Sequence, residues 1–143
     1  MNLERAIEIA VSAHKSQVDK GGSPYILHPI RVMMSLNSED EKIVGVLHDV
    51  VEDSDEWDFE RLIKEGFSEQ VINALKSVTK YSGNENYKEF IKRARHNKIG
   101  RSVKIADIKD NLDIHRLGAL QISDLERINK YKMALAVLNE RVF

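Results

Sequence analysis

The sequence predicts an all-α fold, a single compact bundle of about seven to eight helices. Apolar residues recur at helical spacing along almost the whole chain, and strand-like alternation of useful length is absent. The prolines, Pro24 and Pro29, lie close together, so the rest of the chain lacks the strongest helix breaker. The chain has 143 residues and no internal repeat. This length suits one core, and we expect a single domain over residues 1–143.

Capping and turn residues divide the first part of the chain into helices. An amphipathic first helix is indicated by residues at helical spacing, namely Leu3, Ala6, Ile7, Ala10, Val11 and His14. Residues 19–24 contain two glycines and a proline and form the clearest loop. A second helix follows His28, with Pro29 in its first turn. Residues 37–40 end this helix and cap the next one.

The remaining elements follow an acidic connector over residues 52–58. A short helix over residues 59–65 ends at Gly66, and the next helix opens at Ser68 and runs through Val78. A turn at residues 82–84 separates it from a helix that runs from Tyr87 to near Asn97. A helical segment over residues 102–112 follows, and the last helix is capped by Ser123 and Asp124 and runs to about Val142.

A run of ionisable residues interrupts an apolar stretch in the third helix: His48, Asp49, Glu52 and Asp53. On one continuous helix these side chains would lie within an arc of about 140°, opposite an apolar face. Unpaired buried charge is costly, so a divalent metal ion is the natural compensation. A His–Asp pair alone is a weak indication, because it is more often a surface pair or a hydrogen-bonded core histidine.

Two further residues place the same kinds of metal ligand elsewhere. His28 stands at the start of the second helix, and Asp107 lies on the helical segment 102–112. With His48 and Asp49 they offer two nitrogen and two carboxylate ligands, a set that suits Mn²⁺, Fe²⁺, Co²⁺ or Zn²⁺. The carboxylates and the lack of cysteine favour the harder Mn²⁺. These ligands would meet only if three helices pack around one point.

A metal held in this way would lower the pKa of a bound water and neutralise charge on a phosphoryl group. Glu52 and Asp53, one turn beyond the ligands, could orient the water or move a proton. Asn111, one turn after Asp107, could hold that ligand or hydrogen-bond a substrate. Lys20, in the glycine-rich loop, is placed to meet a phosphate or the face of a nucleobase.

The composition excludes several other classes of function. The formal net charge is −1, so no global attraction to nucleic acid or to an anionic membrane is expected. The sequence has no cysteine, no signal peptide and no apolar run of membrane-spanning length, and we expect a cytoplasmic protein. The basic run over residues 92–101 is expected to form a solvated face or a subunit contact in a homo-oligomer. His14, His96 and His115 are expected to have structural or solvated positions.

The arrangement His28…His48-Asp49…Asp107 resembles the H…HD…D signature of the HD-domain metal-dependent phosphohydrolases. It is most similar to the alarmone-hydrolase domains of the RelA/SpoT homologues, including the small stand-alone alarmone hydrolases. The matching stretches are residues 13–17, 20–29, 47–53 and 104–107, together with Asn111. Each piece alone is weak, but the combination is highly specific.

The resemblance implies an all-helical fold with one bound Mn²⁺, although another divalent transition metal is an alternative. By position, the metal ligands would be His28, His48, Asp49 and Asp107, the water-activating residues Glu52 and Asp53, and the substrate-binding residues Lys20, Tyr25 and Asn111. The implied reaction removes pyrophosphate from the 3′ position of ppGpp or pppGpp, the nucleotides of the stringent response, and leaves GDP or GTP.

Two positions depart from the family pattern. The family usually has a basic residue directly before the lysine that matches Lys20, and here it is Asp19. It also usually has a basic residue two positions after the asparagine that matches Asn111, and here it is Asp113. Each acidic residue should disfavour a highly anionic substrate by about 1 kcal/mol. The alternatives are therefore a phosphatase for another nucleotide or phosphorylated cofactor, and a non-catalytic helical domain that senses a nucleotide.

Overall fold

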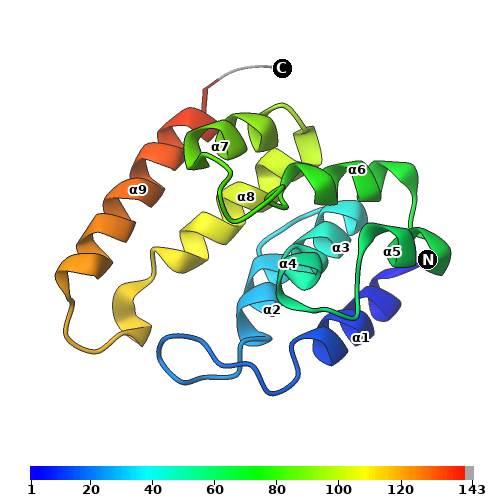
Figure 1. Ribbon diagram of the computed structural model, residues 1–143, viewed down its shortest axis with the longest axis horizontal. Helices are drawn as coiled ribbons and strands as arrows, with labels where there is room; N and C mark the ends of the chain where they lie inside the picture. Colours follow the sequence, from blue (N-terminus) through cyan, green and yellow to red (C-terminus); the bar gives the residue numbers. More distant parts are fainter. Residues whose placement is uncertain (141–143) are drawn as a thin grey trace.

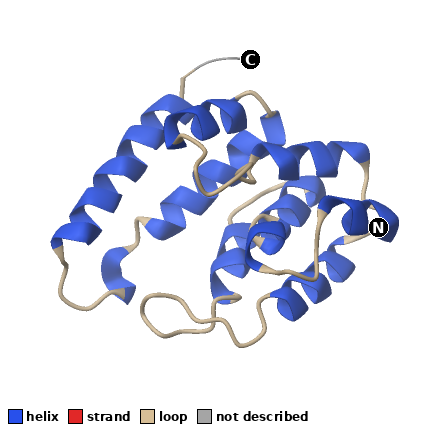
Figure 2. Ribbon diagram, in the orientation of Figure 1, coloured by secondary structure: helices blue, strands red, loops and turns tan. Residues whose placement is uncertain are grey.

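The computed structural model describes residues 1–140, which form an all-helical structure without a strand (Figure 1 and Figure 2). The predicted all-α fold is confirmed. The elements in order are α1 (Leu3–Ala13), α2 (Leu27–Met34), α3 (Glu39–Leu47), α4 (Val50–Asp53), α5 (Phe59–Glu65), α6 (Glu69–Ser77), α7 (Tyr87–Arg95), α8 (Lys98–Asn111), the 3₁₀ helix η1 (Ile114–Arg116) and α9 (Ile122–Leu138). None of the helices in the described residues is long and apolar enough to cross a membrane.

Helix α3 is central because it packs against α1, α2, α6 and α8. It begins with a capping box, in which the Ser38 hydroxyl accepts the Glu41 backbone N–H and the Glu41 carboxylate accepts the Ser38 N–H. Gly45 permits a close approach to the end of α2, since a Cβ here would stand 2.7 Å from Leu36 Cδ1. All residues of α3 over 43–47 are buried. This packing holds the C-terminal end of α3 against α2 and α8.

Helix α8 is the second central element and contacts α2, α3, α6, α7 and α9. Figure 1 shows it between the N-terminal helices and the pair formed by α7 and α9. α9 packs through Ala134 and Leu138, its buried residues, and leaves most of its length on the surface. Residues from both halves of the chain therefore meet along α8.

Gly100, in the first turn of α8, marks a close approach to α6. A Cβ on Gly100 would stand 2.0 Å from Ser77 Oγ, which itself donates to the Ala74 carbonyl at 2.7 Å. Alanine normally favours a helix over glycine by about 1 kcal/mol. The overlap outweighs this gain, and we expect Gly100→Ala to lower the free energy of unfolding by about 1–3 kcal/mol, measured by chemical denaturation. Adding Ser77→Ala should recover part of the loss; a double variant without recovery would contradict this explanation.

The predicted helix ends agree with the structure in one case and differ in another. α5 ends at Gly66, whose φ of 102° lies in the left-handed region that glycine tolerates. The predicted cap of the last helix at Ser123 and Asp124 is wrong. Gln121 is the N-cap, and the Asp124 carboxylate accepts the Gln121 N–H at 2.9 Å from within the first turn. The predicted end of this helix, near Val142, lies outside the described residues.

The apolar stripe predicted for α1 is confirmed at five of its six positions. Ala6, Ala10 and His14 are buried, and Leu3 and Ile7 pack against the core. Val11 is 49% exposed, so its inclusion was wrong, and the buried face also contains Ile9 and Ala13.

The helix predicted to carry the ionisable run is interrupted. α3 ends before His48, and Glu52 and Asp53 lie on the separate short helix α4. The prediction of one continuous helix over this run is therefore wrong. On a continuous helix, adjacent side chains diverge by about 100°. At the break, His48 Nε2 and Asp49 Oδ2 lie only 3.0 Å apart.

Candidate metal centre

Four side chains from three parts of the chain meet where α2, α3 and α8 pack together. His28 Nε2, from the first turn of α2, lies 2.9 Å from Asp107 Oδ1 of α8 and 3.8 Å from Asp49 Oδ2. His48 Nε2 lies 3.0 Å from Asp49 Oδ2 and 3.5 Å from Asp107 Oδ1. The ligand atoms of His28, His48 and Asp49 all lie within 4.8 Å of one another. We call these four residues the His–Asp cluster.

Hydrogen bonds on the far side of each imidazole direct its Nε2 atom into the His–Asp cluster. His48 Nδ1 donates to the Gly45 carbonyl at 2.6 Å, and His28 Nδ1 donates to Asp110 Oδ2 at 2.6 Å. Metal-bound histidines typically donate their second N–H to a carbonyl or a carboxylate in this way. Both imidazoles are therefore arranged to offer Nε2 as a ligand.

Asp110 is a site residue that sequence reasoning missed. Its carboxylate is held by Arg31, whose Nε lies 2.8 Å from Oδ1 and whose Nη2 lies 3.1 Å from Oδ2. The signal that could have revealed it is its spacing, because a residue three positions after Asp107 lies on the same face of a helix. The resulting chain, from Arg31 through Asp110 to His28, fixes the orientation of one proposed ligand.

Asp110→Asn is expected to weaken the binding of a divalent metal ion, with Mn²⁺ as the probe, by about 10–100-fold, because the amide accepts a hydrogen bond from His28 more weakly than the carboxylate does. Titration calorimetry with Mn²⁺ measures the change. Lys109→Gln is the matched control, since Lys109 is exposed on the same helix and does not touch the His–Asp cluster. Unchanged Mn²⁺ affinity in Asp110→Asn would contradict the orienting role.

Three residues of the His–Asp cluster are buried, Asp49 is partly exposed, and the charges of the cluster interact strongly. His48 is 2% exposed, and its Nε2 has no hydrogen-bond partner among the described residues. Burial lowers the pKa of His48, but Asp49 and Asp107 outweigh it and raise this pKa well above its ordinary value. Burial raises the pKa of Asp107, but Lys104 and His48 outweigh it and hold this pKa well below its ordinary value. An orphaned buried nitrogen that faces two charged carboxylates fits a divalent cation.

Glu52 and Asp53, the residues expected to activate water, differ in position. Glu52 lines the pocket beside the His–Asp cluster, and its Oε1 accepts the Lys80 backbone N–H at 2.7 Å. Asp53 does not line this pocket. Partial burial, followed by the charges of Asp49 and Glu52, raises the pKa of Asp53 to about 6. The geometry therefore favours Glu52 as the residue that faces a substrate.

Gln17, on the loop after α1, contacts the backbone of Asp53. Gln17 Nε2 donates to the Asp53 carbonyl at 2.9 Å, and Gln17 Oε1 accepts from His14 Nδ1 at 2.8 Å. His14 is buried, and its ring centroid lies 5.0 Å from that of Tyr25. The packed position agrees with the structural role expected for His14. Gln17 gave no signal in the sequence beyond its place in a matching stretch.

The residues expected to bind substrate lie around the His–Asp cluster. Tyr25 Oη donates to Asp49 Oδ2 at 2.5 Å, and Asn111 Nδ2 donates to Asp107 Oδ1 at 3.1 Å. Each of these two side chains therefore orients a carboxylate of the cluster. Lys20 differs from them, because it lies on the loop between α1 and α2 and lines a neighbouring pocket.

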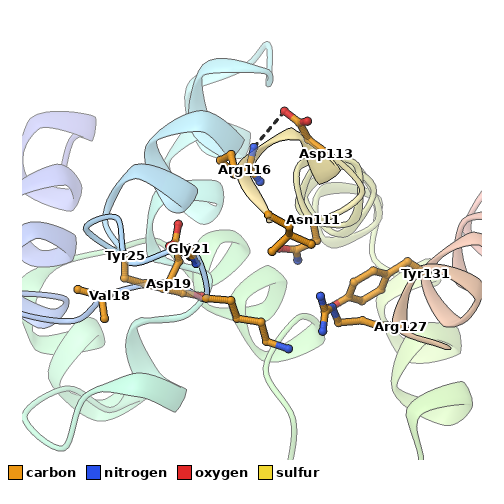
Figure 3. A pocket seen from close by; sticks show the side chains of 11 residues that line it. Val18, Asp19, Gly21, Tyr25, Asn111, Asp113, Arg116, Arg127 and Tyr131 are labelled. Atoms are coloured by element: carbon orange, nitrogen blue, oxygen red, sulfur yellow. Dashed lines mark hydrogen bonds and ion pairs between the residues drawn. The ribbon is translucent and has the colours of Figure 1, made fainter. Parts of the chain in front are cut away.

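One pocket adjoins the His–Asp cluster, and a second pocket lies beside the first. The metal-side pocket, of about 170 Å³, is lined by His28, Asp49 and Asp107 and by Glu52, Lys80, Lys104 and Lys130. The distal pocket, of about 270 Å³, is lined by Asp19, Lys20, Asp113, Arg116 and Arg127 (Figure 3). Tyr25, Asn111 and Tyr131 line both pockets and so connect them. The distal pocket is therefore the neighbouring space for the rest of a molecule whose reacting group lies at the cluster.

The two acidic residues that depart from the family pattern have structural roles beside the distal pocket. Asp19 Oδ1 accepts the backbone N–H groups of Gly21 and Ser23, each at 2.9 Å, and so folds the loop around its carboxylate. Asp113 caps the 3₁₀ helix and lies 3.1 Å from Arg116 Nη1. Their charges are therefore engaged in local contacts of the loop and of η1.

The fold and the cluster define a helical domain with a candidate metal centre, and the comparisons identify its family. The model of the HD domain family matches residues 6–109, which include all four residues of the His–Asp cluster. The chain belongs to the HD domain family.

Several curated proteins are similar to this chain. It is 35% identical over 121 residues to the guanosine-3′,5′-bis(diphosphate) 3′-pyrophosphohydrolase of Aquifex aeolicus, covering 77% of this chain and 17% of that protein. It is 37% identical over 97 residues to the protein of the same name from Borreliella burgdorferi, covering 65% of this chain and 14% of that protein. It is 32% identical over 84 residues to the GTP pyrophosphokinase of Myxococcus xanthus, covering 56% and 11%. The chain therefore spans a small part of each relative's length.

Proposed function

We propose that this HD domain is a Mn²⁺-dependent phosphohydrolase that converts ppGpp to GDP and pyrophosphate, and pppGpp to GTP and pyrophosphate. The observation that carries the proposal is the mostly buried His–Asp cluster beside a pocket that holds Glu52 and three lysines. Two of the similar proteins carry the name of a hydrolase for this substrate, which supports the choice of nucleotide.

We assign the metal to the two imidazoles and two carboxylates of the His–Asp cluster. A set of nitrogen and oxygen donors without thiolate suits Mn²⁺. When bound, the ion would lower the pKa of a coordinated water and neutralise charge on the phosphoryl group. The unpartnered Nε2 of His48 supports this assignment, since a buried polar atom without a partner is costly.

In the proposed reaction, the oxygen of water attacks the phosphorus atom that is bonded to the ribose 3′ oxygen. The bond between that phosphorus and the 3′ oxygen breaks, the 3′ oxygen takes up a proton, and pyrophosphate leaves. Glu52 is placed to accept the proton from the attacking water, because the Lys80 N–H fixes one carboxylate oxygen in the pocket. With a pKa of about 6, Asp53 is suited to exchange that proton with solvent near neutral pH.

Other residues of the metal-side pocket would hold the substrate. Lys80 and Lys130 are suited to bind phosphate oxygens as charged hydrogen-bond donors. Tyr25 and Asn111 would keep Asp49 and Asp107 in position during the reaction. Because both also line the distal pocket, they stand where the nucleoside would leave the reacting group.

Release of pyrophosphate from ppGpp by the Mn²⁺-loaded protein tests the proposal, with EDTA-treated protein as the control. We expect Mn²⁺-dependent formation of GDP and pyrophosphate in equal amounts. Absence of both products, with Mn²⁺ binding shown by calorimetry, would overturn the proposed reaction and leave the metal assignment standing.

A second candidate is hydrolysis of a less anionic nucleotide or phosphorylated cofactor at the same site. The pairing of Arg116 with Asp113 in the distal pocket favours it, because this arginine is already engaged by a carboxylate. The same assay with a panel of phosphoesters distinguishes the two candidates.

A further inference from the structure

We infer that the distal pocket disfavours negative charge, so that each phosphate at the end of the substrate remote from the reacting group lowers the efficiency of hydrolysis. The domain would then prefer nucleotides with few phosphates at the end remote from the reacting group. The inference rests on the proposed function, which places the reacting phosphate in the metal-side pocket. It is carried by the contacts of the cations that line the distal pocket, since most of them are already paired with carboxylates of this chain.

Arg116 is held by two aspartates. Its Nη1 lies 3.1 Å from Asp113 Oδ2, the contact drawn as a dashed line in Figure 3. Its Nη2 donates to the Asp110 carbonyl at 2.7 Å and lies 3.5 Å from Asp110 Oδ2. A phosphate that approached this guanidinium would have to displace Asp113 or accept repulsion from its carboxylate.

Arg127, which reaches the pocket from α9, is neutralised in the same way. Its Nη2 lies 2.8 Å from Asp124 Oδ1, and both side chains are largely buried. Asp124 is fixed in turn, because its carboxylate accepts the Gln121 N–H. Asp19 adds a further negative charge to the lining of the pocket. Among the described residues, Lys20 is the distal cation that has no carboxylate within 4.0 Å.

In the metal-side pocket, by contrast, most of the cations are not paired with a carboxylate in the described part of the chain. Within residues 1–140, Lys80 and Lys130 have no carboxylate within 4.0 Å, and both line this pocket. Lys104 pairs with Asp107. A divalent cation bound to Asp107 would compete with Lys104 for the negative charge of this carboxylate. Unpaired cations for a diphosphate are therefore concentrated beside the His–Asp cluster, while the distal pocket offers one.

The lining of the distal pocket is polar, and its positive and negative charges nearly cancel, which suits a ribose and a base. Tyr25 and Tyr131 supply aromatic surface, and Asn111 supplies an amide, between the two pockets (Figure 3). A few placed polar groups among aromatic side chains are typical of small-molecule sites. Each additional phosphate in this pocket would meet Asp19 and Asp113 at close range.

The test compares kcat/KM for a series of guanosine 3′-diphosphates that carry no, one, two or three phosphates at the 5′ position, with the Mn²⁺-loaded protein. We expect the compounds with no or one 5′-phosphate to be the best substrates. The kcat/KM should fall by about threefold or more for each further 5′-phosphate, as expected for partly screened repulsion between a phosphate and the aspartates of the pocket over several ångströms.

Two isosteric variants identify the residues responsible. Asp113→Asn and Asp124→Asn each retain an oxygen that can accept the local backbone N–H, but they remove the charge that pairs with Arg116 or Arg127. We expect them to raise kcat/KM for the compounds with two and three 5′-phosphates more than for the others. Glu126→Gln is the matched control, because it changes the net charge equally on an exposed side chain that lines neither pocket. It should leave the order of the substrates unchanged.

Two results would overturn the inference while leaving the proposed function intact. The first is a kcat/KM that rises with the number of 5′-phosphates, and the second is an equal rise of kcat/KM for all four compounds in Asp113→Asn and Asp124→Asn. If none of the four compounds is hydrolysed, the proposed function fails. Dissociation constants of the same compounds, measured by calorimetry on the metal-loaded protein, then decide the inference separately. Weaker binding with each added 5′-phosphate would support it, and tighter binding would refute it.

Discussion

Asp49→Asn is expected to abolish hydrolysis and to weaken Mn²⁺ binding by about 100-fold or more. Asp49 Oδ2 faces the Nε2 atoms of both His48 and His28, at 3.0 and 3.8 Å. An amide has no full negative charge to offset the cation. Loss of this charge leaves Asp107 as the one carboxylate of the cluster.

Mn²⁺ affinity by calorimetry and product release by chromatography measure both effects of Asp49→Asn. Tyr25 Oη can still donate to the Asn oxygen, so the fold should remain, which circular dichroism checks. Asp55→Asn is the control, since Asp55 is exposed on the connector after α4 and lines neither pocket. Retention of both Mn²⁺ affinity and turnover in Asp49→Asn would refute the proposed metal site.

Glu52→Gln is expected to lower kcat by about 10²–10⁴-fold while Mn²⁺ binding stays close to that of the native protein. The Gln oxygen can still accept the Lys80 N–H, so the local structure has no reason to change. The amide cannot accept a proton from water. The separation of metal binding from turnover distinguishes this variant from Asp49→Asn.

Steady-state kinetics and Mn²⁺ titration of the same Glu52→Gln preparation measure this separation. Glu56→Gln serves as its control, because Glu56 is an exposed glutamate four residues later and lines neither pocket. Near-native turnover in Glu52→Gln would show that another group accepts the proton, with Asp53 the next residue to test.

The structure changes the meaning of the acidic residues at positions 19 and 113. Interpreted from the sequence alone, they only add repulsion towards an anionic substrate. In the structure, Asp19 folds its loop by accepting two backbone N–H groups, and Asp113 pairs with Arg116. Replacement of Asp19 by a basic residue would therefore break the loop as well as change the charge. Removal of charge with an isosteric amide is the cleaner experiment.

The break between α3 and α4 shows where periodicity fails as a guide. The pattern over residues 43–53 is compatible with one helix, and local spacing cannot distinguish a continuous helix from an interrupted one. The break places His48 Nε2 beside Asp49 Oδ2 while His48 Nδ1 bonds back to Gly45. Only the packing of α3 against α2 and α8 shows why this arrangement is held.

The sequence by itself determined the helical class, the caps at Ser38 and Gly66, and the identity of the candidate ligands. These features depend on side-chain spacing and capping within a few residues, which a sequence displays directly. Tertiary structure alone decided which partners surround those ligands, including the contacts of Asp110 with Arg31 and of Gln17 with the Asp53 carbonyl. Both contacts join residues far apart in the chain, and their distances follow from how the helices pack, which no local pattern records.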